Sequence, residues 1–169
     1  MFIPDNFKIP THLSNEQFHF EVLAPAFCVL DYEAVMSSKE RLRHVFSQDD
    51  NWPEDDMSFE SNKNDLIMHA DEFNARKAFA YAVLNSEKDT YIGCVYINPT
   101  EQENYDCEVY LWVKDSELLL DKFLFQSVEN WLQEEWPFRL RAYPGRTISP
   151  GKIGNKGLGF SNKILPLFS

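Results

Sequence analysis

Two apolar runs followed by a stretch with helical spacing constrain the fold more than any other part of the chain. Residues 91–97 (Tyr-Ile-Gly-Cys-Val-Tyr-Ile) and 107–113 (Cys-Glu-Val-Tyr-Leu-Trp-Val) are rich in the aromatic and β-branched side chains that favour strands. Asn98-Pro99 ends the first run, and Asp115-Ser116 offers an N-cap before apolar residues at helical spacing over 118–132. A strand that leads straight into a helix N-terminus is a frequent site for a phosphate-bearing ligand, because free amides and the helix dipole favour an anion.

Hydrophobic periodicity predicts the remaining elements. Ser37 and Glu40 have the spacing of a capping box, in which each side chain bonds the backbone amide of the other residue. The acidic stretch 47–57 lacks the alternating ligands and central glycine of a calcium loop, so we expect a solvated loop there. We expect, in chain order, an irregular arm at 1–18, a broken strand or two short strands at 20–23 and 27–30, helices at 38–47 and 57–75, strands at 77–84, 91–98 and 106–113, a helix at 116–135 and a strand at 138–143.

Charge is distributed unevenly along the 169 residues. The net charge is −11, yet no Asp or Glu follows Glu135, so the last 34 residues sum to +6 and the first 135 to −17. An acidic body repels a phosphate backbone, which excludes nucleic acid as a partner. We therefore expect one domain over 1–146 and a glycine-rich basic tail over 147–169, with an apolar anchor at 164–168.

The cysteines and the N-terminus bear on the compartment. Cys28, Cys94 and Cys107 are an odd number without CxxC spacing, and each lies in an apolar run, which predicts buried free thiols in a reducing cytoplasm. No basic region followed by an apolar stretch opens the chain, and no run is long enough to span a bilayer, so we expect neither a signal peptide nor a membrane partner. The four histidines show no metal-ligand spacing, and we expect no metal site.

The predicted element order resembles the GNAT superfamily of acetyl-CoA-dependent N-acyltransferases over about residues 20–146. That order is β, α, α, three antiparallel strands, α, β, and the "Ile-Gly" of the first apolar run is typical of the family. The resemblance implies an α+β fold, with a mixed, mostly antiparallel sheet flanked by helices and a truncated or irregular C-terminal part. It is carried by Phe79–Leu84, Tyr91–Pro99, Tyr110–Val113, Trp131-Leu132, Trp136–Phe138 and Tyr143–Arg146.

The resemblance also implies a place for acetyl-CoA as cosubstrate. In GNAT proteins the fourth strand splays from the fifth, and the pantetheine arm lies against its exposed backbone. By position, that strand corresponds here to Leu111, Trp112 and Val113, and the pyrophosphate would meet the amides of the following helix start, at Ser116, Glu117 and Leu118.

The connection 114–120 departs from the family pattern. It has no glycine, whereas the family's glycines let the backbone close around the pyrophosphate. Asp115 and Glu117 each oppose an anion by something on the order of 1 kcal/mol when partly exposed. Only 23 residues follow Arg146, too few for the family's last helix and two strands. Two hypotheses follow: an N-acyltransferase that moves an acetyl group to an unidentified amine, or a GNAT-fold protein without catalysis that serves as a ligand- or protein-binding domain.

Direct acyl transfer needs a base for the amine and an acid for the leaving thiolate. Glu108 lies beside the expected cleft and is our candidate base, with a half-exposed surface carboxylate as the alternative. Tyr143 is our candidate acid, with a packed ring and a bonded hydroxyl as the alternative. Tyr143 lies in the expected strand 138–143. The period of two along that strand predicts one face with Phe138, Leu140 and Ala142 and the opposite face with Arg139, Arg141 and Tyr143.

Two further expectations concern the acceptor and the assembly. The acceptor is a small-molecule or peptide amine, and His69, with Glu72 three residues on, lies on the helix that often shapes the acceptor site in the family. A lone histidine on a helix flank is more commonly structural. An exposed strand edge left by the truncated sheet could pair with a second chain as a homodimer.

Overall fold

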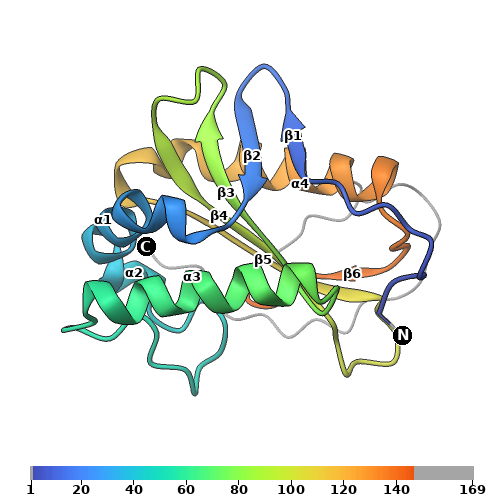
Figure 1. Ribbon diagram of the computed structural model, residues 1–169, viewed down its shortest axis with the longest axis horizontal. Helices are drawn as coiled ribbons and strands as arrows, with labels where there is room; N and C mark the ends of the chain where they lie inside the picture. The colour runs from blue at the N-terminus through green and yellow to red at the C-terminus, as the bar shows by residue number, and fades with distance from the viewer. Residues whose placement is uncertain (1, 147–169) are drawn as a thin grey trace.

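A six-stranded sheet forms the centre of the molecule. The computed structural model describes residues 2–146, and the strands follow one another across the sheet in the order β1-β2-β3-β4-β5-β6 (Figure 1). Every neighbouring pair is antiparallel except β5 and β6, which are parallel. The bounds are β1 His12–Ser14, β2 Phe18–Val22, β3 Phe79–Asn85, β4 Tyr91–Asn98, β5 Cys107–Val113 and β6 Arg141–Ala142.

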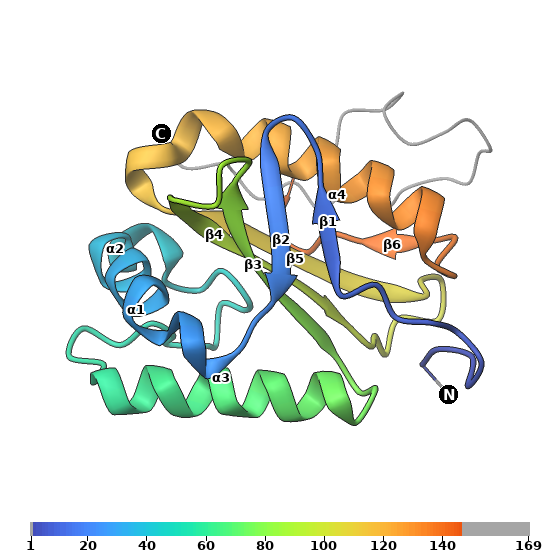
Figure 2. The same cartoon turned by 45° about the horizontal axis from the view of Figure 1, so that its top comes forward.

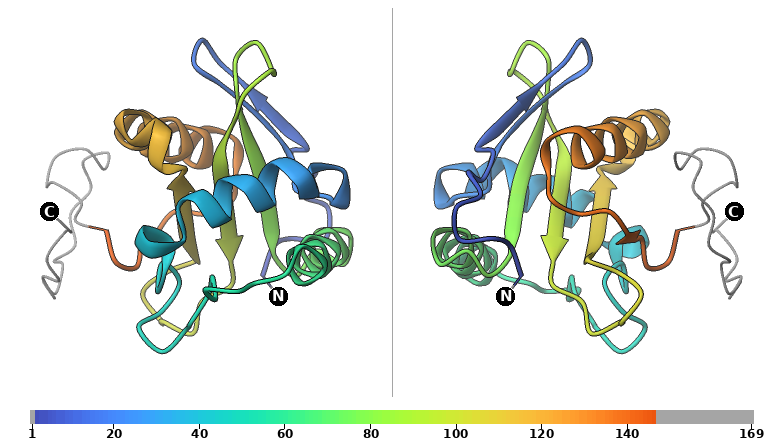
Figure 3. Two further views of the ribbon diagram at one scale, coloured as in Figure 1. Left: turned by 90° about the vertical axis from the view of Figure 1, so that its left-hand side faces the viewer. Right: turned by 90° about the vertical axis from the view of Figure 1, so that its right-hand side faces the viewer.

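Helices cover both faces of this sheet. Three α-helices lie on one face and α4 lies on the other, as the side views show (Figures 2 and 3). The predicted α+β class, with a mostly antiparallel sheet flanked by helices, is therefore confirmed. The bounds are η1 Pro25–Phe27, α1 Cys28–Ser37, α2 Lys39–Leu42, α3 Phe59–Asn74, η2 Asp115–Leu120 and α4 Asp121–Glu135.

The side chains of the central strands point alternately to the two faces of the sheet, and each face has its own hydrophobic core. Tyr81 and Val83 point toward α4, whereas Ala80 and Ala82 point toward α1 and α3. Trp131 of α4 packs edge-on against Tyr81 with ring centroids 5.0 Å apart. The small alanines admit α1 and α3 close to the sheet, and the large aromatic rings fill the space under α4. The sheet is thus buried on both faces, which fits the near-continuous apolar runs of β3 and β4.

The first helical region differs from the prediction. Residues 27–30, expected as a strand, belong to η1 and α1, because Pro25 starts a helical turn and α1 buries Asp31, Ala34 and Val35 at helical spacing. The helix expected at 38–47 is wrong as well. The Ser37 hydroxyl bonds back to the Ala34 carbonyl within α1 (3.0 Å), so no capping box forms. α2 is four residues long, and an extended loop follows it.

The arm at 1–18 is more ordered than expected. Its residues 12–14 form β1, and the Asn15 side chain accepts hydrogen bonds from the Gln17 and Phe18 amides (2.9 Å each), which closes the turn into β2. Ile3 is buried in the core under α4. The short β1 places few unpaired backbone groups at this edge of the sheet.

The last strand is shorter than the predicted 138–143. The Asp106 carboxylate accepts from the amides of Arg139 and Leu140 (2.6 and 2.8 Å), so these residues bond a side chain in place of a strand partner. Only Arg141 and Ala142 pair with β5. The predicted two-face alternation fails as a result, because Leu140 is exposed and Tyr143 is buried. The predicted basic tail at 147–169 and its apolar anchor at 164–168 lie outside the described residues.

Candidate active site

Within residues 2–146, β5 has an open edge over most of its length. β6 pairs with it only at Cys107 and Glu108, while β5 continues to Val113 against β4. No strand among the described residues pairs with 109–113 on the side away from β4. Backbone groups of alternate residues, which include Leu111 and Val113, therefore point into the gap where β6 diverges. The resemblance to the GNAT family implied a splay between two neighbouring strands at Leu111, Trp112 and Val113, and β5 and β6 diverge there.

Two arginines bind the carbonyls of this open edge. Arg146 donates to the Leu111 carbonyl (3.0 Å) and makes two hydrogen bonds with the carboxylate of Asp121, at 2.8 and 2.6 Å. Arg41, at the end of α2, donates to the Val113 carbonyl and to Asp115 (2.6 Å to Oδ1). Each guanidinium therefore links the edge of β5 to an acid at the start of the η2–α4 segment.

One of the two acids at the strand-to-helix junction, Asp115, is less repulsive to an anion than the sequence alone indicates. Arg41 neutralises the charge of Asp115, and the Asp115 amide donates to the Ser38 hydroxyl (2.8 Å). The Glu117 amide donates to the Lys114 carbonyl (2.9 Å) and is engaged within the 3-10 turn. The predicted helix start at 116 is η2, and Glu117 has non-helical dihedral angles, so α4 itself begins at Asp121.

A cleft of about 650 Å³ lies on the face of the sheet that α1 and α3 cover. Its walls come from α1, α3, the loop between α2 and α3, the segment before β3, β4, β5 and the segment that follows β4. We call it the acceptor cleft. The side chains that line it combine aromatic rings with carboxylates. Its aromatic residues are Phe46, Trp52, Tyr96 and Tyr110, and its acids are Asp31, Asp50, Asp65, Glu72 and Glu108.

Glu108 is held at the β5 side of the acceptor cleft by three hydrogen bonds. Thr100 and Gln102, from the β4–β5 connection, donate to its Oε1 at 2.9 and 3.0 Å, and the Tyr110 hydroxyl donates to its Oε2 at 2.9 Å. Glu108 also pairs with Ala142 in the last rung before β6 diverges. The carboxylate is thus fixed at the point where the open edge of β5 begins.

The floor of the cleft contains a buried acid. Asp31 is 3% exposed and accepts from Tyr91 (2.7 Å) and from the Asn62 side chain (2.9 Å). Burial raises the pKa of Asp31, although these hydrogen bonds oppose the shift. Burial also raises the pKa of Asp65, and the nearby charge of Asp31 adds to that effect.

His69 lies beside these acids on α3. Burial lowers the pKa of its imidazole, and the carboxylates of Glu72 and Asp65 partly offset that shift. Its Nδ1 is 3.6 Å from Glu72, and its ring centroid is 5.3 Å from that of Tyr96. A lowered pKa favours a neutral imidazole near pH 7, which is the form that accepts a proton.

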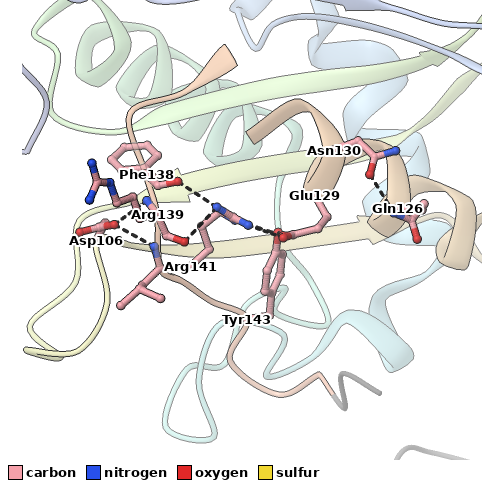
Figure 4. A network of polar contacts seen from close by, with 9 residues as sticks. Asp106, Gln126, Glu129, Asn130, Phe138, Arg139, Arg141 and Tyr143 are labelled. Atoms are coloured by element: carbon pink, nitrogen blue, oxygen red, sulfur yellow. Dashed lines mark hydrogen bonds and ion pairs between the residues drawn. The ribbon is translucent and has the colours of Figure 1, made fainter. Parts of the chain in front are cut away.

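Tyr143 and Glu108 lie on opposite faces of the sheet. Tyr143 is 6% exposed, packs in the core under α4, and donates its hydroxyl to the buried Glu129 (Figure 4). Burial, together with the charge of Glu129, raises the pKa of the Tyr143 phenol. Arg141 pairs with the same carboxylate and turns its guanidinium under α4, as Figure 4 shows. The two candidate catalytic side chains are therefore not brought together.

Two negative findings complete the description. Over residues 2–146, no group of three or more His, Cys, Asp or Glu side chains is arranged to hold a metal ion. No helix in this described part is long and apolar enough to cross a membrane.

Comparison with known proteins supports the fold. No protein-family model matches the chain, and no curated protein matches it. Ribosomal-protein-S5-alanine acetyltransferase from Vibrio fischeri has a TM-score of 0.54 at 16% identity, over 73% of this chain and 67% of that one. The ribosomal L7/L12 alpha-N-protein acetyltransferase RimL, in complex with coenzyme A, has 0.56 at 16%, over 73% and 66%. FdhC, a nucleotide-linked sugar GNAT, has 0.55 at 8%, over 79% and 71%.

The chain has the GNAT fold. It spans about two thirds of the length of the first two of these proteins. At 8 to 16% identity the likeness extends to the fold and not to the activity.

Several residues of the site have no strong signal in the sequence. Arg41 meets Asp115 from 74 positions upstream, and only the folded chain brings them together. Arg146 follows an expected strand, but its contact with Leu111 depends on the early end of β6. Phe46 and Trp52 offered one usable signal, because they are aromatic residues in or beside an otherwise acidic loop.

Proposed function

We propose that the protein is an N-acetyltransferase that moves an acetyl group from acetyl-CoA to an amine. The observation that carries this proposal is the open edge of β5, which begins at Glu108, beside the acceptor cleft. A thioester lying along that edge would contact β5, the strand that also carries Glu108, and the carboxylate of Glu108 faces the cleft. The acetyltransferases with similar folds, one of them in complex with coenzyme A, support the proposal.

The cosubstrate would use backbone groups of the open edge. We place the pantetheine arm against Leu111, Trp112 and Val113, and the pyrophosphate near Ser116, Glu117 and Leu118. Arg41 would offset the negative charge of Asp115 at that junction. Because Arg146 already bonds the Leu111 carbonyl, the arm would compete with this side chain.

The proposed reaction is direct attack of a neutral amine on the thioester carbonyl. Glu108 takes the proton that the amine loses, with His69 as a second base in the same cleft. A C–N bond forms, the C–S bond breaks, and the products are an N-acetylated amine and the free thiol of CoA.

The leaving thiolate needs a proton donor. Tyr143 remains our sequence-based candidate, and its hydroxyl would have to leave Glu129 to act. The Tyr110 hydroxyl is a second candidate, because it already bonds Glu108 on the cleft side.

One observation favours the alternative, a GNAT-fold domain that binds a ligand or protein without catalysis. Both carbonyls of the open edge, at Leu111 and Val113, already accept hydrogen bonds from arginine side chains. An edge occupied in this way needs no cosubstrate to satisfy it.

Calorimetric titration with acetyl-CoA, followed by a free-thiol assay with a panel of amines, separates the two proposals. Binding followed by amine-dependent release of CoA is the result expected of an enzyme. A ligand at about 100 times its dissociation constant should also stabilise the fold by about 2.7 kcal/mol. Absence of both binding and thermal stabilisation at millimolar acetyl-CoA would overturn the proposed activity.

A further inference from the structure

The acceptor cleft differs from the cofactor edge in how its acids are paired. At the edge, Asp115 and Asp121 each bond an arginine. Among residues 2–146, Asp31, Asp50, Asp65 and Glu108 have no cationic side chain within 4.0 Å, and Glu72 meets only His69. Of the described residues, Lys77 is the only lysine or arginine that lines the cleft. Within residues 2–146, the negative charge of the cleft is therefore largely unpaired.

Mutual repulsion among these acids supports the same conclusion. Burial is the main cause of the raised pKa of Asp65; the charge of His69 opposes that shift, and the charges of Asp31 and Asp50 add to it. A raised pKa means that the ionised form of the carboxylate is less stable in the protein than in water. A bound cation between the acids would relieve that repulsion, whereas an anionic acceptor would increase it.

Phe46, Trp52 and Tyr110 are partly exposed in the cleft and supply surfaces for an alkyl chain that carries cations. Phe46 lies at the centre of this group, with its ring centroid 5.3 Å from Trp52, 5.0 Å from Tyr96 and 5.3 Å from Tyr110. Ring faces attract ammonium groups and pack against methylene groups. A flat or strongly polar acceptor would make poorer use of such walls.

The acids are spread along the cleft. Asp65 and Glu72 are seven residues apart on α3, which is about 10 Å along a helix at about 1.5 Å per residue. Glu108 belongs to β5, on another wall. One ammonium group cannot reach all of these carboxylates, whereas a flexible chain with two or three ammonium groups can.

We propose that the acceptor is a linear aliphatic polyamine, bound along the acceptor cleft with one terminal amine at Glu108 and its other ammonium groups at the acids of α3. The inference rests on the proposed acetyl transfer, which gives the cleft its role. It deepens that function by naming the substrate class.

Calorimetry without any thioester tests this binding independently of catalysis. The probes are 1,4-diaminobutane, the triamine spermidine, 1-aminobutane and 4-aminobutanoate, which share a four-carbon amine and differ in what the other end carries. We expect spermidine to bind at least about tenfold more tightly than 1-aminobutane and the zwitterion to bind most weakly, with salt weakening the polyamines.

Variants show where the polyamine binds. The double variant Asp65→Asn, Glu72→Gln should remove most of the advantage of spermidine over 1-aminobutane. Asp71→Asn is the matched control, because Asp71 is an exposed acid on the same helix that does not line the cleft. Circular dichroism and thermal unfolding confirm that both variants fold.

The possible outcomes separate the two proposals. Equal affinity for spermidine and 1-aminobutane, or an unchanged affinity in the double variant, overturns the polyamine inference. Acetyl transfer to a peptide amine without polyamine binding also overturns it and leaves the acetyltransferase proposal intact. Selective polyamine binding without any CoA release overturns the acetyltransferase proposal and supports a polyamine as the ligand of the cleft.

Discussion

Glu108 is the residue on which the proposed chemistry depends most. Its carboxylate is fixed by Thr100, Gln102 and Tyr110 at the mouth of the open edge. Glu108→Gln keeps the shape and most of the hydrogen bonds but cannot take a proton. We expect kcat to fall by a factor on the order of 10² to 10⁴, with acetyl-CoA affinity unchanged. Steady-state kinetics on the best amine measures this.

The control for that substitution is Glu103→Gln, at an exposed position of the β4–β5 connection. It should leave kcat as in the wild type. A Glu108→Gln protein with full kcat would show that Glu108 is not the base, and His69 would then be the next side chain to change.

Asp31 predicts a pH-dependent stability. Burial raises the pKa of Asp31 in the folded protein above the ordinary value for an aspartate. The stability associated with its protonated form is therefore fully present below the unfolded pKa and is lost as pH rises through the folded pKa. Asp31→Asn stays neutral at all pH values, so the wild type should lose stability relative to this variant as pH rises.

Urea unfolding between about pH 4 and pH 8 checks this, with Asp71→Asn as the control on an exposed acid. A constant difference in unfolding free energy between wild type and Asp31→Asn across that range would contradict the assigned shift. A wild type that gains stability relative to the variant as pH rises would contradict it more strongly.

At the scale of elements, one arginine links the open edge of β5 to the start of α4. Arg146 bonds both Leu111 and Asp121. The double variant Asp121→Asn, Arg146→Met removes this link and leaves the net charge unchanged. If the pantetheine arm competes with Arg146 for the Leu111 carbonyl, calorimetry should show several-fold tighter acetyl-CoA binding in the variant.

Arg139→Met is the control for loss of an exposed arginine outside the link. Weaker acetyl-CoA binding in the double variant, with normal binding in Arg139→Met, would mean that Arg146 helps to hold the cosubstrate. The competition proposed for the open edge would then be wrong.

The short strand β6 is anchored to α4 by a buried ion pair. Arg141 and Glu129 have side chains that are 6% and 3% exposed, and Tyr143 bonds the same carboxylate (Figure 4). Arg141→Met leaves the Glu129 charge buried without its cation, which should cost about 3 to 5 kcal/mol of unfolding free energy. Adding Glu129→Leu should restore much of that loss, and chemical denaturation measures both. A loss below about 1 kcal/mol would contradict the anchoring role.

The elements that sequence reasoning predicted are those with continuous local patterns. β3, β4, β5 and α3 have apolar runs or a helical stripe that packing reinforces, and they appear close to their expected bounds. α1 was missed because its first residues are apolar, like a strand, although Val29 and Leu30 are exposed. β6 was predicted too long because the Asp106 side chain takes two of its amides, a contact that depends on tertiary structure.

At the scale of the molecule, the site is assembled from segments that are far apart in the sequence. The predicted positions 111–113 and Glu108 belong to the strand that forms the open edge, as expected from the family order. The pairing of Asp115 with Arg41 and the aromatic walls of the acceptor cleft depend on how the loop after α2 crosses the sheet. No local pattern encodes that crossing. The predicted homodimer remains a prediction.

The most direct test of the central claim is a backbone NMR titration of the protein with coenzyme A. At 19.8 kDa the chain is suited to this measurement. If CoA binds along the open edge, the largest amide shift changes should fall on residues 109–113 and 116–118, with smaller ones near Arg41 and Arg146. Absence of shift changes at millimolar CoA, or changes confined to the β1–β2 hairpin and the outer surface of α3, would contradict a cofactor site between β5 and β6.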